Sequence, residues 1–198
     1  MKPAGKVLLV ALAAGALGVA AGLWSEGPGM LLQSEIGQRA MQGALSANAP
    51  PTPAGLATAD RGELIPTLQL TDLDGQRVTL PNSHAGRPLL INFWASWCGP
   101  CIKEMPELDR FATAQGADGV QVIGVALDQA DAVRGFLQHT PVRYPILLDT
   151  PGPRDSAVQL GNPAGVLPFT ALVDADGRLL KQKVGPFEPG EIDSWVSP

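Results

Sequence analysis

The chain has 198 residues, of which 45% are hydrophobic and 17% are charged, so it can hold one domain of ordinary size plus an extension. This composition suits a globular core and excludes a largely disordered polypeptide. The formal net charge of −5 argues against nucleic acid or an anionic membrane surface as the partner, which makes another protein the better candidate.

Residues 1–24 have the features of a signal anchor. An apolar run over 7–24 follows Lys2 and Lys6, and its length is at the lower edge of what spans a bilayer. The positive-inside rule then places the N-terminus in the cytoplasm and the rest of the chain outside it. The alternative is a cleaved signal peptide with Gly18-Val19-Ala20 as its cleavage site. Both interpretations predict an exported domain.

Residues 25–62 are expected to form a linker. A Gly-Pro-Gly sequence ends the apolar segment, and the scattered apolar residues of 30–45 are compatible with a short helix. Three prolines lie among Ala and Thr within 47–57, a composition typical of a tether. The folded domain is therefore expected over residues 63–198.

Strand and helix patterns alternate through this domain. Two pairs of strands are joined by Asp-Gly turns, which indicate hairpins. The expected strands are 67–70, 77–80, 88–93, 119–127, 144–148, 169–174 and 179–184. The expected helices are 98–115, 128–139, 154–160 and 188–196. This order predicts an α/β fold with a mixed central sheet that helices cover on both faces.

The sequence Trp97-Cys98-Gly99-Pro100-Cys101 lies where a strand ends and a helix begins, and it holds both cysteines of the chain. Two thiols with this spacing can close a small disulfide ring and reopen it, because the N–H groups at a helix start stabilise a thiolate. Cys98, nearer to solvent and to the helix end, is the expected nucleophile, and Cys101 is the expected resolving thiol. A zinc site would need two more ligands, and only the separated His84 and His139 remain.

This motif resembles the active site of the thioredoxin superfamily. The run 92–98, followed by Glu104 and Pro106, is similar to the membrane-tethered extracytoplasmic branch of TlpA and ResA type. The resemblance covers residues 63–198 and implies a thioredoxin-like fold with an N-terminal hairpin and a central helix–strand insert. It also implies a location on the periplasmic side of the bacterial inner membrane, or in the periplasm if the signal is cleaved. The chain has no fingerprint of a flavin, nicotinamide or phosphate site, so no cofactor or metal is expected.

The resemblance also assigns roles to residues around the cysteines. Pro168 matches the cis-proline that faces the active site, and its neighbour Leu167 would pair with a client strand. Glu104 would tune the protonation of the cysteine pair; the alternative is a solvated helix glutamate. Asn92 replaces the buried aspartate of thioredoxins, and Trp97 would offer a flat apolar contact to clients and shield the Cys98 sulfur.

The sequence therefore predicts an extracytoplasmic thiol–disulfide oxidoreductase that reduces disulfides in client proteins. The resemblance implies clients such as apocytochrome c or copper-site assembly proteins, and re-reduction by a membrane electron donor. The Gly-Pro pair between the cysteines is similar to that of reducing thioredoxins. Two alternatives remain: a disulfide-forming oxidase of the same fold, and a tethered module that binds a soft metal such as copper(I) through its thiols.

Overall fold

A computed structural model of the chain describes residues 34–116 and 119–197. These residues belong to two compact units that divide after Met41, and the sheet and the disulfide lie wholly in the unit that starts at Gln42. No helix in the described part of the chain is both long enough and apolar enough to cross a bilayer. The predicted anchor, residues 1–24, lies outside the described residues.

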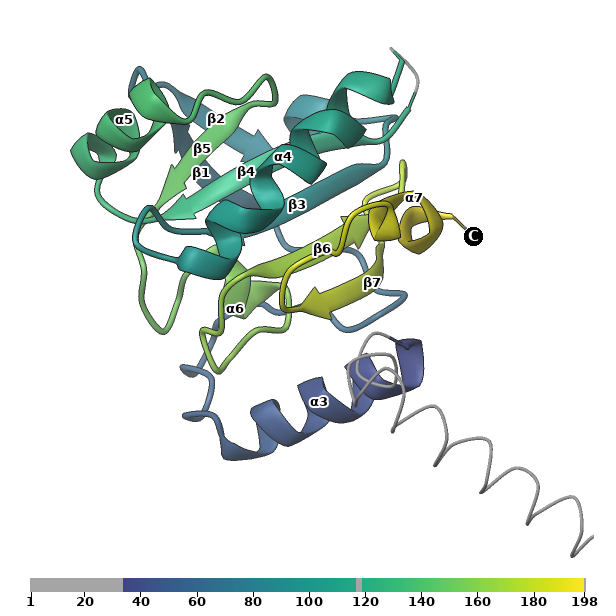
Figure 1. Cartoon of the computed structure of the whole chain (residues 1–198). Helices are drawn as coiled ribbons and strands as arrows, with labels where there is room; N and C mark the ends of the chain where they lie inside the picture. The colour runs from purple at the N-terminus through teal and green to yellow at the C-terminus, as the bar shows by residue number, and fades with distance from the viewer. Residues whose placement is uncertain (1–33, 117–118, 198) are drawn as a thin grey trace, which may run out of the picture. The chain divides into compact units, whose positions relative to one another are not determined.

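The second unit is built on one seven-stranded sheet with the strand order β2-β1-β5-β4-β3-β6-β7 (Figure 1). The strands are β1 (Leu68–Asp72), β2 (Arg77–Leu80), β3 (Leu89–Trp94), β4 (Gln121–Leu127), β5 (Ile146–Asp149), β6 (Phe169–Val173) and β7 (Leu179–Val184). The pairs β3·β4 and β4·β5 are parallel, and the other neighbours are antiparallel. The N-terminal hairpin joins the sheet through β1 and β5, which confirms the predicted mixed sheet and hairpin.

Both hairpins depend on their Asp-Gly turns. Gly75 and Gly177 adopt φ values of 80° and 85°, in the left-handed region that favours glycine. Each turn begins with an aspartate, Asp72 or Asp174, whose Oδ1 accepts two backbone N–H groups of the turn. These side-chain contacts explain why the sequence signal for the two hairpins is reliable.

The helices are α3 (Glu35–Asn48), α4 (Gly99–Ala114), α5 (Ala130–His139), α6 (Ser156–Gln159) and α7 (Glu191–Val196), with a 3-10 turn η1 (Asn82–His84). The four helices of the sheet domain, α4 to α7, are all shorter than predicted, and for α6 and α7 the residue before the helix explains the later start. Helix α6 begins only after Asp155, whose side chain caps it by accepting the Val158 N–H. Helix α7 begins after Gly190, which has a left-handed φ of 80°. Helix α3 ends three residues beyond the predicted segment 30–45.

Helices cover both faces of the sheet. Leu90 and Trp94 of β3 pack in one apolar cluster with residues of α4, α5 and α7. In β7, Lys183 faces the same side, since its Nζ lies 2.7 Å from Glu191 Oε1 at the start of α7. The preceding Gln182 faces the opposite side, where its Nε2 donates to the Leu160 carbonyl just beyond α6. This arrangement confirms the predicted coverage.

Candidate active site

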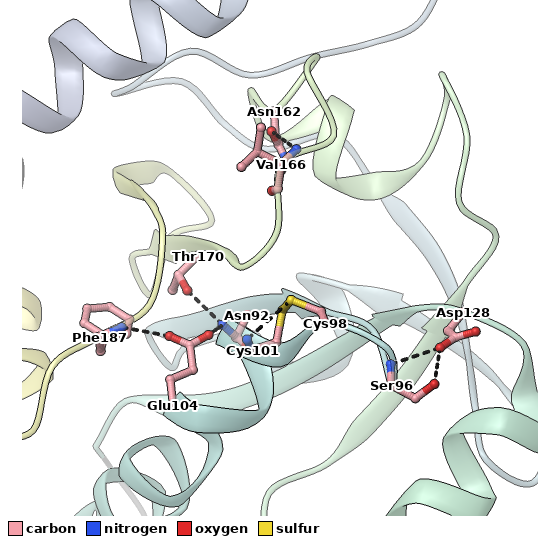
Figure 2. Close-up of a disulfide and its surroundings, with 10 residues drawn as sticks. All are labelled: Asn92, Ser96, Cys98, Cys101, Glu104, Asp128, Asn162, Val166, Thr170 and Phe187. Atoms are coloured by element: carbon pink, nitrogen blue, oxygen red, sulfur yellow. Dashed lines mark hydrogen bonds between the residues drawn. A yellow bond between two sulfur atoms is a disulfide. The ribbon is translucent and has the colours of Figure 1, made fainter.

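Cys98 and Cys101 form a disulfide at the first turn of α4, with an S–S distance of 2.00 Å (Figure 2). Cys98 is the N-cap residue of the helix, and the backbone N–H of Cys101 donates to its sulfur at 3.3 Å. Pro100 occupies the first turn, where its missing N–H leaves no hydrogen bond unmade. The start of the helix thus places the Cys101 N–H within hydrogen-bond distance of the sulfur of Cys98, the predicted nucleophile.

Cys98 is the more exposed of the two cysteines, as predicted, but both are buried in this disulfide-bonded state. Cys98 is 5% exposed and Cys101 is fully buried, because both belong to the apolar cluster beneath α4. Leu167 packs against the same cluster from the facing loop. Trp97 stands out from this packing with 72% exposure, so it presents a free aromatic surface directly beside Cys98.

The Leu167–Pro168 peptide bond is cis, as predicted. Pro168 directly precedes β6, whose strand pairs with β3, so this loop reaches the edge of the sheet where the cysteine motif begins. Within the described residues, neither the N–H nor the carbonyl of Leu167 has a hydrogen-bond partner. These two groups are available to an added peptide strand.

Asn162 fixes the loop before Leu167. It is buried, its Nδ2 donates to the Val166 carbonyl at 2.9 Å, and its Oδ1 accepts the Val166 N–H at 3.2 Å. Figure 2 shows this pair on the loop that faces the disulfide. Both backbone groups of Val166 are thereby occupied. Sequence reasoning missed Asn162, because no local pattern marks an asparagine that binds the backbone four residues later.

A row of polar residues crosses the sheet beneath α4. Asn92 of β3 lies opposite Thr170 of β6, and Thr170 lies opposite Lys183 of β7. The Asn92 Nδ2 donates to Glu104 Oε1 at 2.8 Å and to Thr170 Oγ1 at 3.0 Å. The side chains of Asn92, Glu104, Thr170 and Lys183 are all buried. The two hydrogen bonds from Asn92 replace the water that Asn92, Glu104 and Thr170 lose on burial.

Glu104 occupies the inner face of α4 and is only 1% exposed, so the alternative of a solvated helix glutamate is wrong. Its Oε2 accepts the backbone N–H of Phe187 at 2.9 Å. Burial raises the pKa of Glu104 to about 7, against the opposing effects of the hydrogen bonds from Phe187 and Asn92 and of the Lys183 cation. Figure 2 shows Asn92 and Glu104 on the Cys101 side of the disulfide.

A second carboxylate fixes the loop on the Cys98 side. Asp128, directly after β4, accepts the backbone N–H of Ser96 at 2.9 Å and its hydroxyl at 2.6 Å (Figure 2). Ser96 lies two residues before Cys98, so this contact ties the cysteine loop to the end of the neighbouring parallel strand. Sequence reasoning missed this pair, although side chains at the carboxyl ends of parallel strands commonly meet.

A disulfide at a helix N-terminus, a facing cis-proline and a mixed sheet with helices on both faces define a thioredoxin-like redox protein. The Redoxin family model matches residues 60–195, well over half of the chain, so the chain belongs to the Redoxin family.

Thiol-disulfide oxidoreductase ResA of Bacillus thuringiensis (strain Al Hakam) is 28% identical over 136 residues, covering 68% of this chain and 76% of that protein. Sporulation thiol-disulfide oxidoreductase A of Bacillus subtilis (strain 168) is 27% identical over 128 residues, covering 63% of this chain and 74% of that protein. The crystal structure of a thioredoxin-related protein from Neisseria meningitidis serogroup B superposes with a TM-score of 0.58 at 35% identity, covering 64% of this chain and 95% of that one. These matches confirm the resemblance to ResA-like members of the thioredoxin superfamily, and they show that the chain is a thiol–disulfide oxidoreductase.

Proposed function

We propose that the Cys98–Cys101 pair, in its dithiol form, reduces disulfides in client proteins. The observation that carries this proposal is the Cys98 sulfur at the N-cap of α4, where the Cys101 N–H points at it. The same donor and the positive end of the helix dipole favour a thiolate at this position. The thiolate is the form that attacks a disulfide.

The reaction is a two-step exchange. The Cys98 thiolate attacks one sulfur of the client disulfide, which forms a mixed disulfide and releases the other client sulfur as a thiolate. Cys101 then attacks Cys98, which forms the Cys98–Cys101 disulfide and releases the second client thiol. Two electrons pass to the client, and a protein donor must reduce the pair again. Leu167 and Trp97 would hold the client segment, with Pro168 keeping the approach free of a backbone N–H.

Glu104 is the candidate proton acceptor for Cys101. Its pKa of about 7 lets it take up or release a proton near neutral pH. Asn92 supports either protonation state, because its amide can rotate to present a donor to the carboxylate or an acceptor to the carboxylic acid. A buried aspartate at this position would face Glu104 with a second negative charge. The substitution of Asn92 thus fits a site in which Glu104 carries the proton.

We further infer that the domain acts on the periplasmic side of the bacterial inner membrane, held by residues 1–24 or released after their cleavage. The apolar run behind two lysines supports export of the domain. Apocytochrome c and copper-site assembly proteins are the client classes that the resemblance suggests, with a membrane protein as the electron donor.

Trapping tests the reaction. Cys101→Ser leaves the mixed disulfide unresolved, so this variant should accumulate covalent complexes with client proteins that dithiothreitol releases. Cys98→Ser is the matched control, because it keeps one cysteine but lacks the proposed nucleophile, and it should trap none. Equal trapping by both variants, or by neither, would contradict the proposed order of attack.

The reduction potential distinguishes the reductase from the oxidase. Equilibration with dithiothreitol or glutathione should give a value near that of thioredoxin, about −270 mV. A value near −120 mV, as in strongly oxidising proteins of this fold, would instead assign the pair to disulfide formation. Stoichiometric, tight binding of copper(I) to the reduced protein would favour the metal-binding alternative.

A further inference from the structure

A groove of about 390 Å³ opens between the cysteine motif and the cis-proline loop. Trp97 and Leu127 line one part of it, and Gly165 and Leu167 line another. Its size lies within the range of pockets that bind small ligands or single segments of a peptide. Since Trp97 precedes Cys98 and Leu167 precedes Pro168, the groove continues directly from the redox site.

The lining of this groove is almost entirely apolar. Six of its residues are prolines: Pro50, Pro51, Pro53, Pro151, Pro153 and Pro163. Among the described residues that line it, only Asp155 is charged; its side chain is 7% exposed and already accepts the N–H groups of Gly152 and Val158. The groove therefore offers ring faces and an exposed indole to an occupant and no uncompensated charge.

Three of those prolines come from the segment expected to be a simple tether. Pro50, Pro51 and Pro53 follow α3, far from the cysteines in sequence, and they line the same groove as Trp97. Three prolines within four residues restrict the backbone of this wall before any client binds. The space of about 390 Å³ remains with the segment in place, so the segment lines the groove and does not fill it.

Both ends of this segment are attached to the sheet domain. Arg61, which follows the segment, donates to Oε1 of Gln42, which precedes it, at 3.3 Å, and to the side chain of Gln182 in β7 at 3.2 Å. Arg61 thus connects both ends of the segment to the sheet. The buried Ala59 donates its N–H to the Gln159 carbonyl of α6 at 2.9 Å. These contacts hold Pro50–Pro53 at the groove before a client binds. Binding therefore costs less conformational entropy than it would with a free linker.

We propose that Pro50–Pro53 is part of the client-binding surface and that the groove takes an extended, uncharged apolar segment next to the client's disulfide. The inference rests on the proposed function, because the occupant reaches the groove from the redox site. Trp97, exposed at its rim, is the aromatic anchor of this surface. The tether thus contributes to the choice of client as well as to reach.

Two synthetic peptides test this inference, each with one intramolecular disulfide flanked either by leucine and valine or by serine. The pre-reduced full chain is mixed with each peptide, and the second-order rate constant is followed by acid quench and chromatography. Each turnover breaks the peptide S–S bond and forms the Cys98–Cys101 bond. The variant carries Pro50→Ser, Pro51→Ser and Pro53→Ser together. The matched control carries Ala54→Ser and Ala57→Ser, which are exposed in the same segment and do not line the groove.

We expect the wild type to prefer the leucine-flanked peptide, and the proline variant to lose about fivefold of this preference. The control should keep the wild-type ratio. An unchanged ratio of the two rate constants in the proline variant would overturn the inference. A faster reaction of this variant with the leucine-flanked peptide would also overturn it, because the segment would then cover the groove and not bind the client. If the wild type reduces both peptides and the proline variant shows the same ratio of rate constants, this inference alone is contradicted and the proposed function stands. A wild type that reduces neither peptide overturns the proposed function, and this inference with it.

Discussion

At the residue scale, Glu104 is the unusual group of the site, because a carboxyl is buried beside the disulfide with two hydrogen-bond donors. Burial raises its pKa to about 7 in the folded protein, whereas its ordinary value is 4.5. Between pH 4.5 and about pH 7 the unfolded chain therefore binds fewer protons at Glu104 than the folded chain does. The contribution of Glu104 to stability is therefore present below pH 4.5 and is lost as the pH rises through about 7.

The first prediction concerns Glu104→Gln. Between pH 5 and pH 8 the free energy of unfolding of the oxidised wild type should fall by about 2 to 3 kcal/mol relative to that of the variant. The measurement is urea unfolding at both pH values. Glu188→Gln is the control, since this exposed glutamate should leave the wild-type pH dependence intact. The same pH dependence in Glu104→Gln and wild type would show that Glu104 is ionised throughout this range.

Asn162 acts at the same scale on the facing loop. Asn162→Ala would leave the N–H and the carbonyl of Val166 without their partner. We expect a loss of about 1 to 3 kcal/mol in the free energy of unfolding, together with faster hydrogen exchange of the Val166 N–H. Asn48→Ala is the control, because Asn48 makes one exposed hydrogen bond within α3 and should cost much less. Unchanged protection of Val166 in Asn162→Ala would contradict the assigned role.

At the element scale, Lys183 connects β7 to α7 and to the site. Its side chain is 2% exposed, its Nζ pairs with Glu191 Oε1, and it lies 5.2 Å from the centre of the Phe187 ring. The backbone N–H of Phe187 in turn binds Glu104. The lysine thus supports the segment that supplies a donor to Glu104 and lowers the pKa of that carboxyl through its charge.

Lys183→Met should therefore move the pH at which Glu104 loses its proton upward. It should also lower the free energy of unfolding by about 2 kcal/mol, because Glu191 keeps a partly buried charge without its partner. Carboxyl NMR titration of Glu104 measures the first effect. Lys181→Met is the control, since Lys181 also joins β7 to the end of α7 through the Trp195 carbonyl, and it should leave the Glu104 titration in place. A downward shift in Lys183→Met would refute the electrostatic argument.

Elements that are marked by a local sequence pattern could be predicted from the sequence. Strand β3 is a continuous apolar run, and the Asp-Gly turns place glycine where a left-handed φ is required. The cysteine spacing likewise predicts the disulfide at the start of α4. Asn162 and Lys183 could not be predicted in the same way. Their contacts depend on cross-strand register and on loops far apart in the chain, which one sequence does not encode locally.

At the scale of the whole molecule, the N-terminal limit of the fold is set by contacts that the sequence does not reveal. The predicted domain starts at residue 63, but three residues before it bind the rest of the unit. The Ala59 N–H donates to the Gln159 carbonyl, and the Gly62 N–H donates to the Leu179 carbonyl at 2.7 Å. Arg61 donates to Gln182 of β7. The strands themselves begin only at Leu68, so no periodic pattern marks these contacts.

Two shortened chains test where the stable unit begins. A chain that starts at Thr58 keeps Ala59, Arg61 and Gly62, whereas a chain that starts at Glu63 loses all three. Each lost hydrogen bond is worth about 1 kcal/mol, so the shorter chain should be less stable by about 2 to 4 kcal/mol in urea unfolding. Both chains should still unfold in one cooperative transition, because every strand of the sheet is present in each. Equal stability of the two chains would show that the contacts of residues 59–62 contribute nothing, and would return the boundary to residue 63.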